Sequence, residues 1–210
     1  MKRIILWVVV SFAVILIMVK GIALLTYPKA SQIMETFPDV YSEPVQKETI
    51  DSPFEIRIGS KNLKIIPKAE YDISGQVVSV KRYYSGLDAK VVPIDIGLCW
   101  GDIAKEENLK KIQFEQYLRW LRYRLKDYGA FDMEYLNSHA GNLHAVPADK
   151  RVRKLLLSVK KNDKIRLRGY LVDVTGNNYS RHSSLSRTDK GDGACEVMYI
   201  REIQINKKRY

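Results

Sequence analysis

The chain has 210 residues, a formal net charge of +11 and an apolar fraction of 46%. This length and apolar fraction exclude a disordered polar chain and allow one domain of ordinary size with additional segments. The positive charge is concentrated, because the stretch from Asp149 to Arg168 holds nine basic and two acidic residues. A local surplus of this kind indicates one basic surface rather than a uniformly basic protein.

Residues 1–27 predict a transmembrane signal anchor. Ile4 to Val19 carries no charge, and Gly21 to Leu25 extends the apolar run past Lys20. At ~1.5 Å per residue, this run crosses the ~30 Å of hydrocarbon in a bilayer. A cleaved signal peptide is the alternative, but no clean small-residue cleavage motif follows the run. We therefore expect a single pass through the inner (cytoplasmic) membrane, with the globular part in the periplasm or extracellular.

Residues 28–53 contain four of the seven prolines of the chain. Spaced prolines suppress helix and favour extended backbone. This segment therefore predicts a semi-rigid stalk that holds a globular domain of residues 54–210 off the bilayer.

Short strands are predicted after the stalk. The stretches FEIRI (54–58) and LKII (63–66) form a hairpin with a four-residue turn. A long strand interrupted by Gly75 follows at 71–84, and KVVPIDIGLCW (90–100) is a further extended segment.

Two helices are predicted next. In the stretch Leu109 to Gly129, apolar residues recur at helical spacing, with Gly129 as the stop; they are Phe114, Leu118, Leu121, Leu125 and Tyr128. The second helix follows Asp149, a plausible N-cap, and its apolar stripe is Val152, Leu155, Leu156 and Val159.

Two more strands close the pattern, at Lys164 to Thr175 and at Glu196 to Ile205. Gly169 interrupts the first of them and predicts a kink or bulge of the kind that turns a strand around a small closed barrel. The runs NDKIRLRGYLVDV and VMYIREIQI resemble the later strands of oligonucleotide/oligosaccharide-binding (OB) barrels. The predicted fold is α+β, mainly β: a small antiparallel OB-like barrel with inserted helices.

The chain has two cysteines, Cys99 and Cys195. An even count in an exported domain favours a disulfide, and two buried free thiols are the alternative.

The order of the landmarks ISGQVVS, CWGD, GNLH, NDKIRLRGYLV and RTDKGDGACE is similar to that of a family of uncharacterised proteobacterial inner-membrane or exported proteins. The resemblance covers most of the soluble part. It implies that Cys99 pairs with Cys195 and that a histidine recurs at the position of His144. It implies neither an activity nor a site made of all three histidines.

The histidines lie in polar stretches, His139 and His144 in SHAGNLH and His182 in SRHSS. Their spacing matches no strong metal motif, so no metal and no cofactor are expected. Asp192 and Gly193, directly before a strand, are typical of a hairpin turn rather than of a calcium loop.

The loop that begins at Arg181 combines guanidinium groups with hydroxyls, which suit phosphate or carboxylate groups. The predicted ligand-binding residues are Arg181, Ser183, Arg187, Asn142 and His144. The alternative is a solvated loop between two strands.

A basic face is predicted from Arg151, Arg153, Lys154, Lys160 and Lys161. Such a face can bind nucleic acid, but an exported, tethered domain meets anionic lipid or envelope polymers first, so nucleic acid is an unlikely partner. A charged face that only keeps the domain soluble is the alternative.

No GxSxG or Walker motif is present in the chain. We therefore expect a membrane-anchored, exported binding module for an anionic ligand or an envelope partner. A hydrolase that uses His144 and His182, with or without the assistance of a metal, is the first alternative. The second is a structural or assembly factor whose partner is a membrane protein.

Overall fold

Strands account for 49% and helices for 18% of the computed structural model, which confirms the mainly β prediction. The structure describes residues 11–12, 14–15, 27–127, 129, 131–187 and 195–210. Its strands are β1 (Gln32–Ile33), β2 (Val45–Glu48), β3 (Phe54–Ile58), β4 (Lys61–Arg82), β5 (Ile94–Cys99), β6 (Ile112–Tyr117), β7 (Trp120–Leu125), β8 (Ala140–Pro147), β9 (Lys164–Gly176), β10 (Tyr179–Arg181), β11 (Glu196–Ile205) and β12 (Lys208–Arg209). Its helices are α2 (Gly86–Val91), α3 (Glu106–Leu109), α4 (Met133–Ser138) and α5 (Lys150–Ser158), with a 3-10 turn at Gly101–Ala104.

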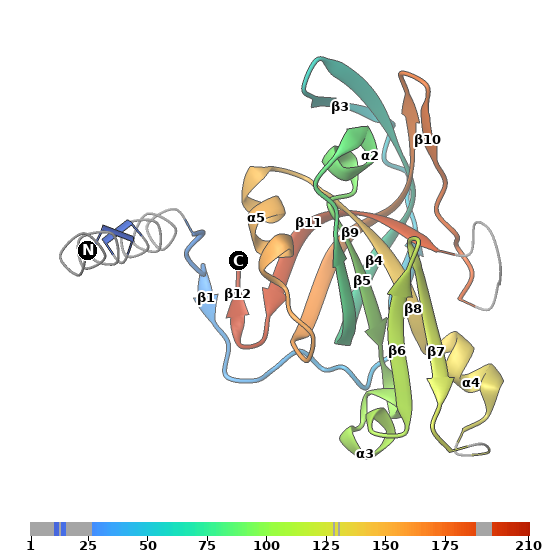
Figure 1. Cartoon of the computed structure of the whole chain (residues 1–210). Coiled ribbons are helices and arrows are strands. Elements are labelled where there is room, and N and C mark those ends of the chain that lie inside the picture. Colours follow the sequence, from blue (N-terminus) through green and yellow to red (C-terminus); the bar gives the residue numbers. More distant parts are fainter. Residues whose placement is uncertain (1–10, 13, 16–26, 128, 130, 188–194) are drawn as a thin grey trace.

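Five of the strands pair in a closed ring (Figure 1). β4 pairs with β5, β5 with β8, β11 with β9, and β9 with β4, all antiparallel. The remaining contact, between β8 and β11, is parallel. β4 and β9 are long enough to extend beyond the ring, where β2, β3 and β10 pair with them.

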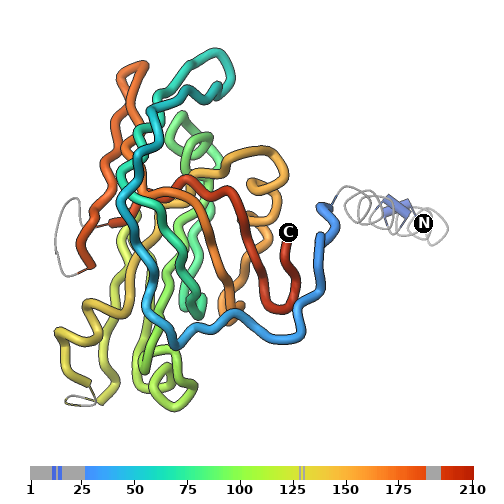
Figure 2. Tube along the Cα trace, turned by 180° about the vertical axis from the view of Figure 1, so that it is seen from behind, coloured from blue at the N-terminus to red at the C-terminus, as the bar shows by residue number. Residues whose placement is uncertain are grey.

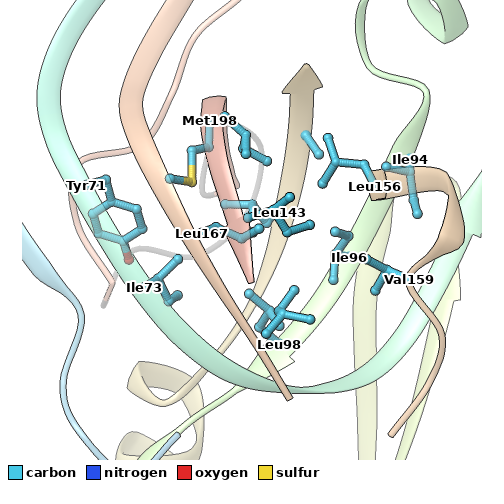
Figure 3. Close-up of a cluster of buried hydrophobic side chains, with 14 of the residues drawn as sticks. Tyr71, Ile73, Ile94, Ile96, Leu98, Leu143, Leu156, Val159, Leu167 and Met198 are labelled. Carbon is cyan, nitrogen blue, oxygen red and sulfur yellow. The ribbon is translucent and has the colours of Figure 1, made fainter. Parts of the chain in front are cut away.

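The inside of the ring is filled by aliphatic side chains from every strand (Figure 3). The period of two along a strand sends Ile94, Ile96 and Leu98 of β5 inward. They meet Leu143 of β8 and Met198 of β11 in the same cluster. This cluster is the core on which the rest of the chain is built.

The same alternation points Asp95, Gly97 and Cys99 to the outer face of β5. The β6–β7 hairpin lies across this face. A Cβ atom on Gly97 would be 2.7 Å from a methyl group of Leu121, so glycine is what lets the hairpin approach this closely.

The helix predicted from Leu109 to Gly129 is therefore wrong. Except for a short turn of helix that ends at Leu109, this stretch is the β6–β7 hairpin, whose buried and exposed residues alternate with period two from Ile112 to Gln116 and from Leu121 to Leu125. The strands predicted after it are confirmed as β9 and β11, and those predicted before it are formed with other bounds. The β3–β4 hairpin turns on two residues, Gly59 and Ser60, instead of four, and β4 runs through Gly75 without a break. β5 begins only at Ile94, because Lys90 and Val91 belong to α2.

The second predicted helix is confirmed as α5. The Asp149 carboxylate accepts a hydrogen bond of 2.7 Å from the backbone NH of Val152, as an N-cap should. Val152, Leu155 and Leu156 are buried in the core cluster, so α5 lies against the ring by its predicted apolar stripe.

Residues 28–53, for which a stalk is predicted, lie against the domain along much of their length (Figure 2). β1 pairs with β12, and β2 pairs with β4. Between them Val40 is 1% exposed, and its carbonyl accepts a hydrogen bond from the NH of Gly101. The segment adds strands to the domain instead of separating it from what precedes.

The predicted anchor lies almost entirely outside the described residues, as does the predicted turn at Asp192 and Gly193. In the part of the chain that is described, no helix has the length and apolar character to span a bilayer.

A bulge lies opposite Gly169, as predicted: the register of β11 against β9 shifts between Ile200 and Glu202. A Cβ atom on Gly169 would lie 1.9 Å from the carbonyl oxygen of Tyr199, which belongs to the backbone and cannot rotate away. β9 and β11 can therefore pair at this point only if residue 169 has no side chain.

We expect Gly169→Ala to lower the free energy of unfolding by about 3 kcal/mol, because the two strands must separate. Gly59→Ala is the control. Gly59 has a positive φ of 64° but nothing within 4 Å of the added atom, so it should lose only about 1 kcal/mol. Urea denaturation measures both, and equal losses would contradict the close contact.

Candidate functional site

A buried carboxylate, Asp95, organises the outer face of β5. Its side chain is 0% exposed, and both oxygens are engaged. Oδ1 accepts hydrogen bonds from His144 Nδ1 at 2.8 Å and from Arg119 Nη1 at 2.9 Å. Oδ2 accepts one from the Tyr83 hydroxyl at 2.9 Å. A buried charge is tolerated only when it is paired and hydrogen-bonded in this way.

Sheet register explains why His144 meets Asp95. The two residues are direct partners across β5 and β8, and His144 is also opposite Val197 of β11. The hydrogen bond to Asp95 uses Nδ1 of the imidazole, which leaves Nε2 as the ring atom that can meet a ligand. The same contact orients the ring.

Arg119 reaches Asp95 from the tip of the β6–β7 hairpin. Its guanidinium lies 3.6 Å from the centre of the Tyr83 ring and contacts Asp88 Oδ2 at 2.5 Å as well as Asp95. The hairpin turns on Leu118 and Arg119, both with positive φ, 45° and 65°. Such a turn normally contains asparagine or glycine, so the contacts of Arg119 hold a backbone that its own side chain disfavours.

Asp88 in α2 links this network to β10. It accepts hydrogen bonds from Arg181 Nε at 2.7 Å and Nη2 at 2.9 Å, and from the Tyr179 hydroxyl at 2.8 Å. Burial alone would raise the pKa of Asp88, but the bonds from Arg181 and Tyr179 outweigh it and hold the pKa below its usual value. Asp88 is therefore ionised at neutral pH.

These segments enclose a cavity of about 450 Å³, which we call the hairpin pocket. The described residues that line it are Leu118, Arg119, Trp120, His144, Ser180, Arg181, His182, Cys195 and Val197. None of these is acidic. The carboxylates of Asp88 and Asp95 are bonded to the guanidinium and imidazole groups of the wall but do not line it.

Three of the predicted site residues meet in the hairpin pocket: His144, Arg181 and His182. Asn142 lies beside it and donates a hydrogen bond of 2.8 Å to the carbonyl of Arg119, which fixes the hairpin tip. Ser183 and Arg187 do not join them. Ser183 accepts a hydrogen bond from the NH of Val197.

Arg187 instead contacts Glu43 at 3.7 Å and the carbonyl of Pro44. The predicted grouping of Arg181 with Arg187 is therefore not formed. The residues that the sequence did not single out are Asp88, Asp95 and Arg119. Of these three, only Asp95 could have been recognised from the sequence, because it is a single acidic residue within an apolar strand.

The predicted basic face is formed in part. Arg151 and Lys154 are exposed on α5, and Lys160 and Lys161 are exposed in the turn that follows it. Arg153 is turned inward, since its guanidinium donates hydrogen bonds to the carbonyls of Ala89 and Lys90 at the end of α2. Burial lowers the pKa of Arg153.

His139 is separate from the pocket. Its ring stacks on Tyr135 with the ring centres 3.7 Å apart, and Nε2 contacts Glu43 at 2.7 Å. Among the residues described, no group of three His, Cys, Asp or Glu side chains could hold a metal ion.

The two cysteines are free thiols, so the predicted disulfide is absent from the structure. β8 lies between β5, which ends in Cys99, and β11, which begins just after Cys195. Two strand spacings place the Cα atoms at about 9 Å or more, beyond the ~7 Å that a disulfide allows. Cys99 donates to the carbonyl of Gln76, and Cys195 lies 3.7 Å from the Asn142 amide.

No family model, curated protein or solved structure matches this chain. The similarity to the proteobacterial membrane-protein family therefore stays a prediction from its sequence landmarks.

We expect two free thiols per chain when the protein is unfolded without a reductant and titrated with Ellman's reagent. In the folded protein both should react slowly, because burial raises the pKa of Cys99 to about 12 and that of Cys195 to about 11. Finding no thiol in the unfolded protein would show that Cys99 and Cys195 form a disulfide after all.

Proposed function

We propose that the protein is a membrane-anchored, exported binding module in which an OB-type barrel takes an anionic ligand into the hairpin pocket. The ring of five strands supports the OB-type assignment, because it is a small closed barrel with one parallel pair between its third and fifth strands. α5 lies between the third and fourth strands of the ring. The apolar run at the start of the sequence supports the anchor.

The choice of ligand rests on how the charged side chains are arranged around the pocket: basic groups line it, and carboxylates lie behind them. All ionisable groups of the described wall, apart from the Cys195 thiol, are arginine or histidine. Each has a carboxylate partner: Asp95 for Arg119 and His144, Asp88 for Arg181 and Asp173 for His182. The carboxylates orient the donors, and the donors face the cavity. A ligand rich in acceptor oxygens fits such a wall.

Arg181 keeps a nitrogen for the ligand, since Asp88 engages its Nε and Nη2 but not Nη1. Nε2 of His144, which donates when the imidazole carries both protons, and the hydroxyl of Ser180, which also contacts Nε2 of His182 at 2.9 Å, lie at the same cavity. Trp120 and Leu118 add apolar surface at the same cavity. The favoured ligand therefore carries a phosphate or carboxylate group attached to a flat or apolar moiety.

A His-dependent hydrolase is the second candidate, and the contact between Asp95 and His144 favours it. A carboxylate on Nδ1 and a free Nε2 are the elements of a general base. Burial raises the pKa of the neighbouring Cys195 thiol to about 11, so little thiolate is present at neutral pH, and the proposed nucleophile is a water that His144 deprotonates. Steady turnover of p-nitrophenyl acetate or phosphate that is lost in His144→Gln would favour this candidate.

The binding proposal is tested with Leu118→Glu, using inorganic pyrophosphate as the probe and calorimetry on the full chain in a non-ionic detergent. Leu118 is 73% exposed and lines the pocket, so glutamate adds a negative charge there without disturbing the buried network. We expect the affinity for pyrophosphate to fall about tenfold.

Leu185→Glu is the matched control, because Leu185 is also exposed but does not line the pocket. Its affinity should equal that of the wild type. Arg181→Gln should weaken binding by about tenfold or more, since a charge-assisted hydrogen bond is lost, whereas Arg187→Gln should not. If the wild type, Leu118→Glu and Arg181→Gln bind pyrophosphate with equal affinity, the pocket is not the anion site.

A further inference from the structure

The first residue of the continuous described chain is packed against α5. The Tyr27 hydroxyl lies 2.7 Å from the Ser158 hydroxyl, at the C-terminal end of that helix. The Tyr27 ring meets the ring of Tyr210 edge to face, with the centres 6.2 Å apart. The chain therefore enters the domain at one defined place, between α5 and the C-terminus.

This entry point limits how far α5 can be from a bilayer. The apolar run of the sequence ends at Leu25, two residues before Tyr27. Two residues of extended chain span at most about 7 Å. Tyr27 therefore lies within about 7 Å of the end of the run, and the C-terminal end of α5 is one tyrosine side chain and one hydrogen bond further. If the run ends inside the hydrocarbon, this end of α5 lies near the headgroup layer. Because residues 28–53 lie against the domain, they do not act as a spacer.

The outer face of α5 is cationic. Lys150, Arg151 and Lys154 are exposed, whereas Val152 and Leu155 are buried in the core. Lys29, next to the entry point, is exposed as well. The helix itself contains no acidic residue, and its N-cap Asp149 is the nearest acid in the sequence.

We propose that α5 rests on the anionic headgroups of the bilayer that holds the anchor, with Lys150, Arg151 and Lys154 as the contact. This inference rests on the membrane anchor of the proposed function and deepens it by giving the domain an orientation. Anionic lipid is the partner we favour, because Tyr27, which contacts the end of α5, follows the apolar run of the sequence by two residues. Each basic residue at such a surface favours the docked state by about fivefold.

The orientation leaves the β6–β7 hairpin facing away from the bilayer. β1, which follows the entry point, and the hairpin lie on opposite sides of the barrel in both views (Figures 1 and 2). A ligand of the hairpin pocket would then arrive from the aqueous side.

The test compares lysine acylation, read by mass spectrometry, on the full chain in phosphatidylcholine discs and in discs that also contain phosphatidylglycerol. We expect Lys150 and Lys154 to react at least about fivefold more slowly in the anionic discs, and high salt to remove the difference. Lys126, just beyond β7, should react equally in both.

Arg151→Glu should reduce the protection of Lys150 and Lys154, and the matched control Arg122→Glu, an exposed arginine of β7, should not. Equal acylation of Lys150 and Lys154 in the two kinds of disc, with the chain still bound to the discs, would overturn the docking of α5 and leave the anchor standing. A chain that elutes apart from the discs would overturn both.

Discussion

The site depends on one buried carboxylate. Asp95 lies in the middle of an apolar strand, where an unpaired charge would cost several kcal/mol. It is compensated by His144 from the neighbouring strand, by Tyr83 from the end of β4 and by Arg119 from the hairpin. Desolvation and the charge of Asp95 raise the pKa of Tyr83, so this hydroxyl keeps its proton and remains a donor. This one group joins the β6–β7 hairpin, which forms a sheet of its own, to the strands of the ring.

The hairpin shows what the carboxylate makes possible. A two-residue turn of leucine and arginine is disfavoured, because each left-handed residue costs about 1–2 kcal/mol. Arg119 offsets this cost with its bonds to Asp95 and Asp88 and its stacking on Tyr83. Gly97 then allows Leu121 to lie on β5. The tip of the hairpin thereby forms part of the pocket wall, together with His144 of β8.

The dependence of the hairpin on distant contacts also explains which elements could be predicted from the sequence. The strands 164–176 and 196–205 and the helix α5 follow from local periodicity, capping and one glycine, and all are confirmed. The hairpin does not follow from such signals. Phe114, Leu118, Leu121 and Leu125 also fit a helix, and the turn carries no Asn-Gly or Asp-Gly signal, because distant contacts of Arg119 hold it. Tertiary contacts therefore determine the secondary structure of this stretch, because its local pattern fits both a helix and a hairpin.

The site was predictable to a similar degree. His144, Arg181 and His182 lie in polar stretches of the sequence, and that signal led to three of the residues that line the pocket. The carboxylate partners of His144 and Arg181 come from a strand and a short helix far away in the sequence, and no spacing rule connects them.

A double-mutant cycle of Asp95→Asn and Arg119→Gln, measured by urea denaturation, tests the central role of this carboxylate most directly. Each single variant removes one charged partner of the other residue, so the two losses should overlap, with a coupling free energy of about 2 kcal/mol. Losses that add within about 0.5 kcal/mol would show that the hairpin does not depend on Asp95.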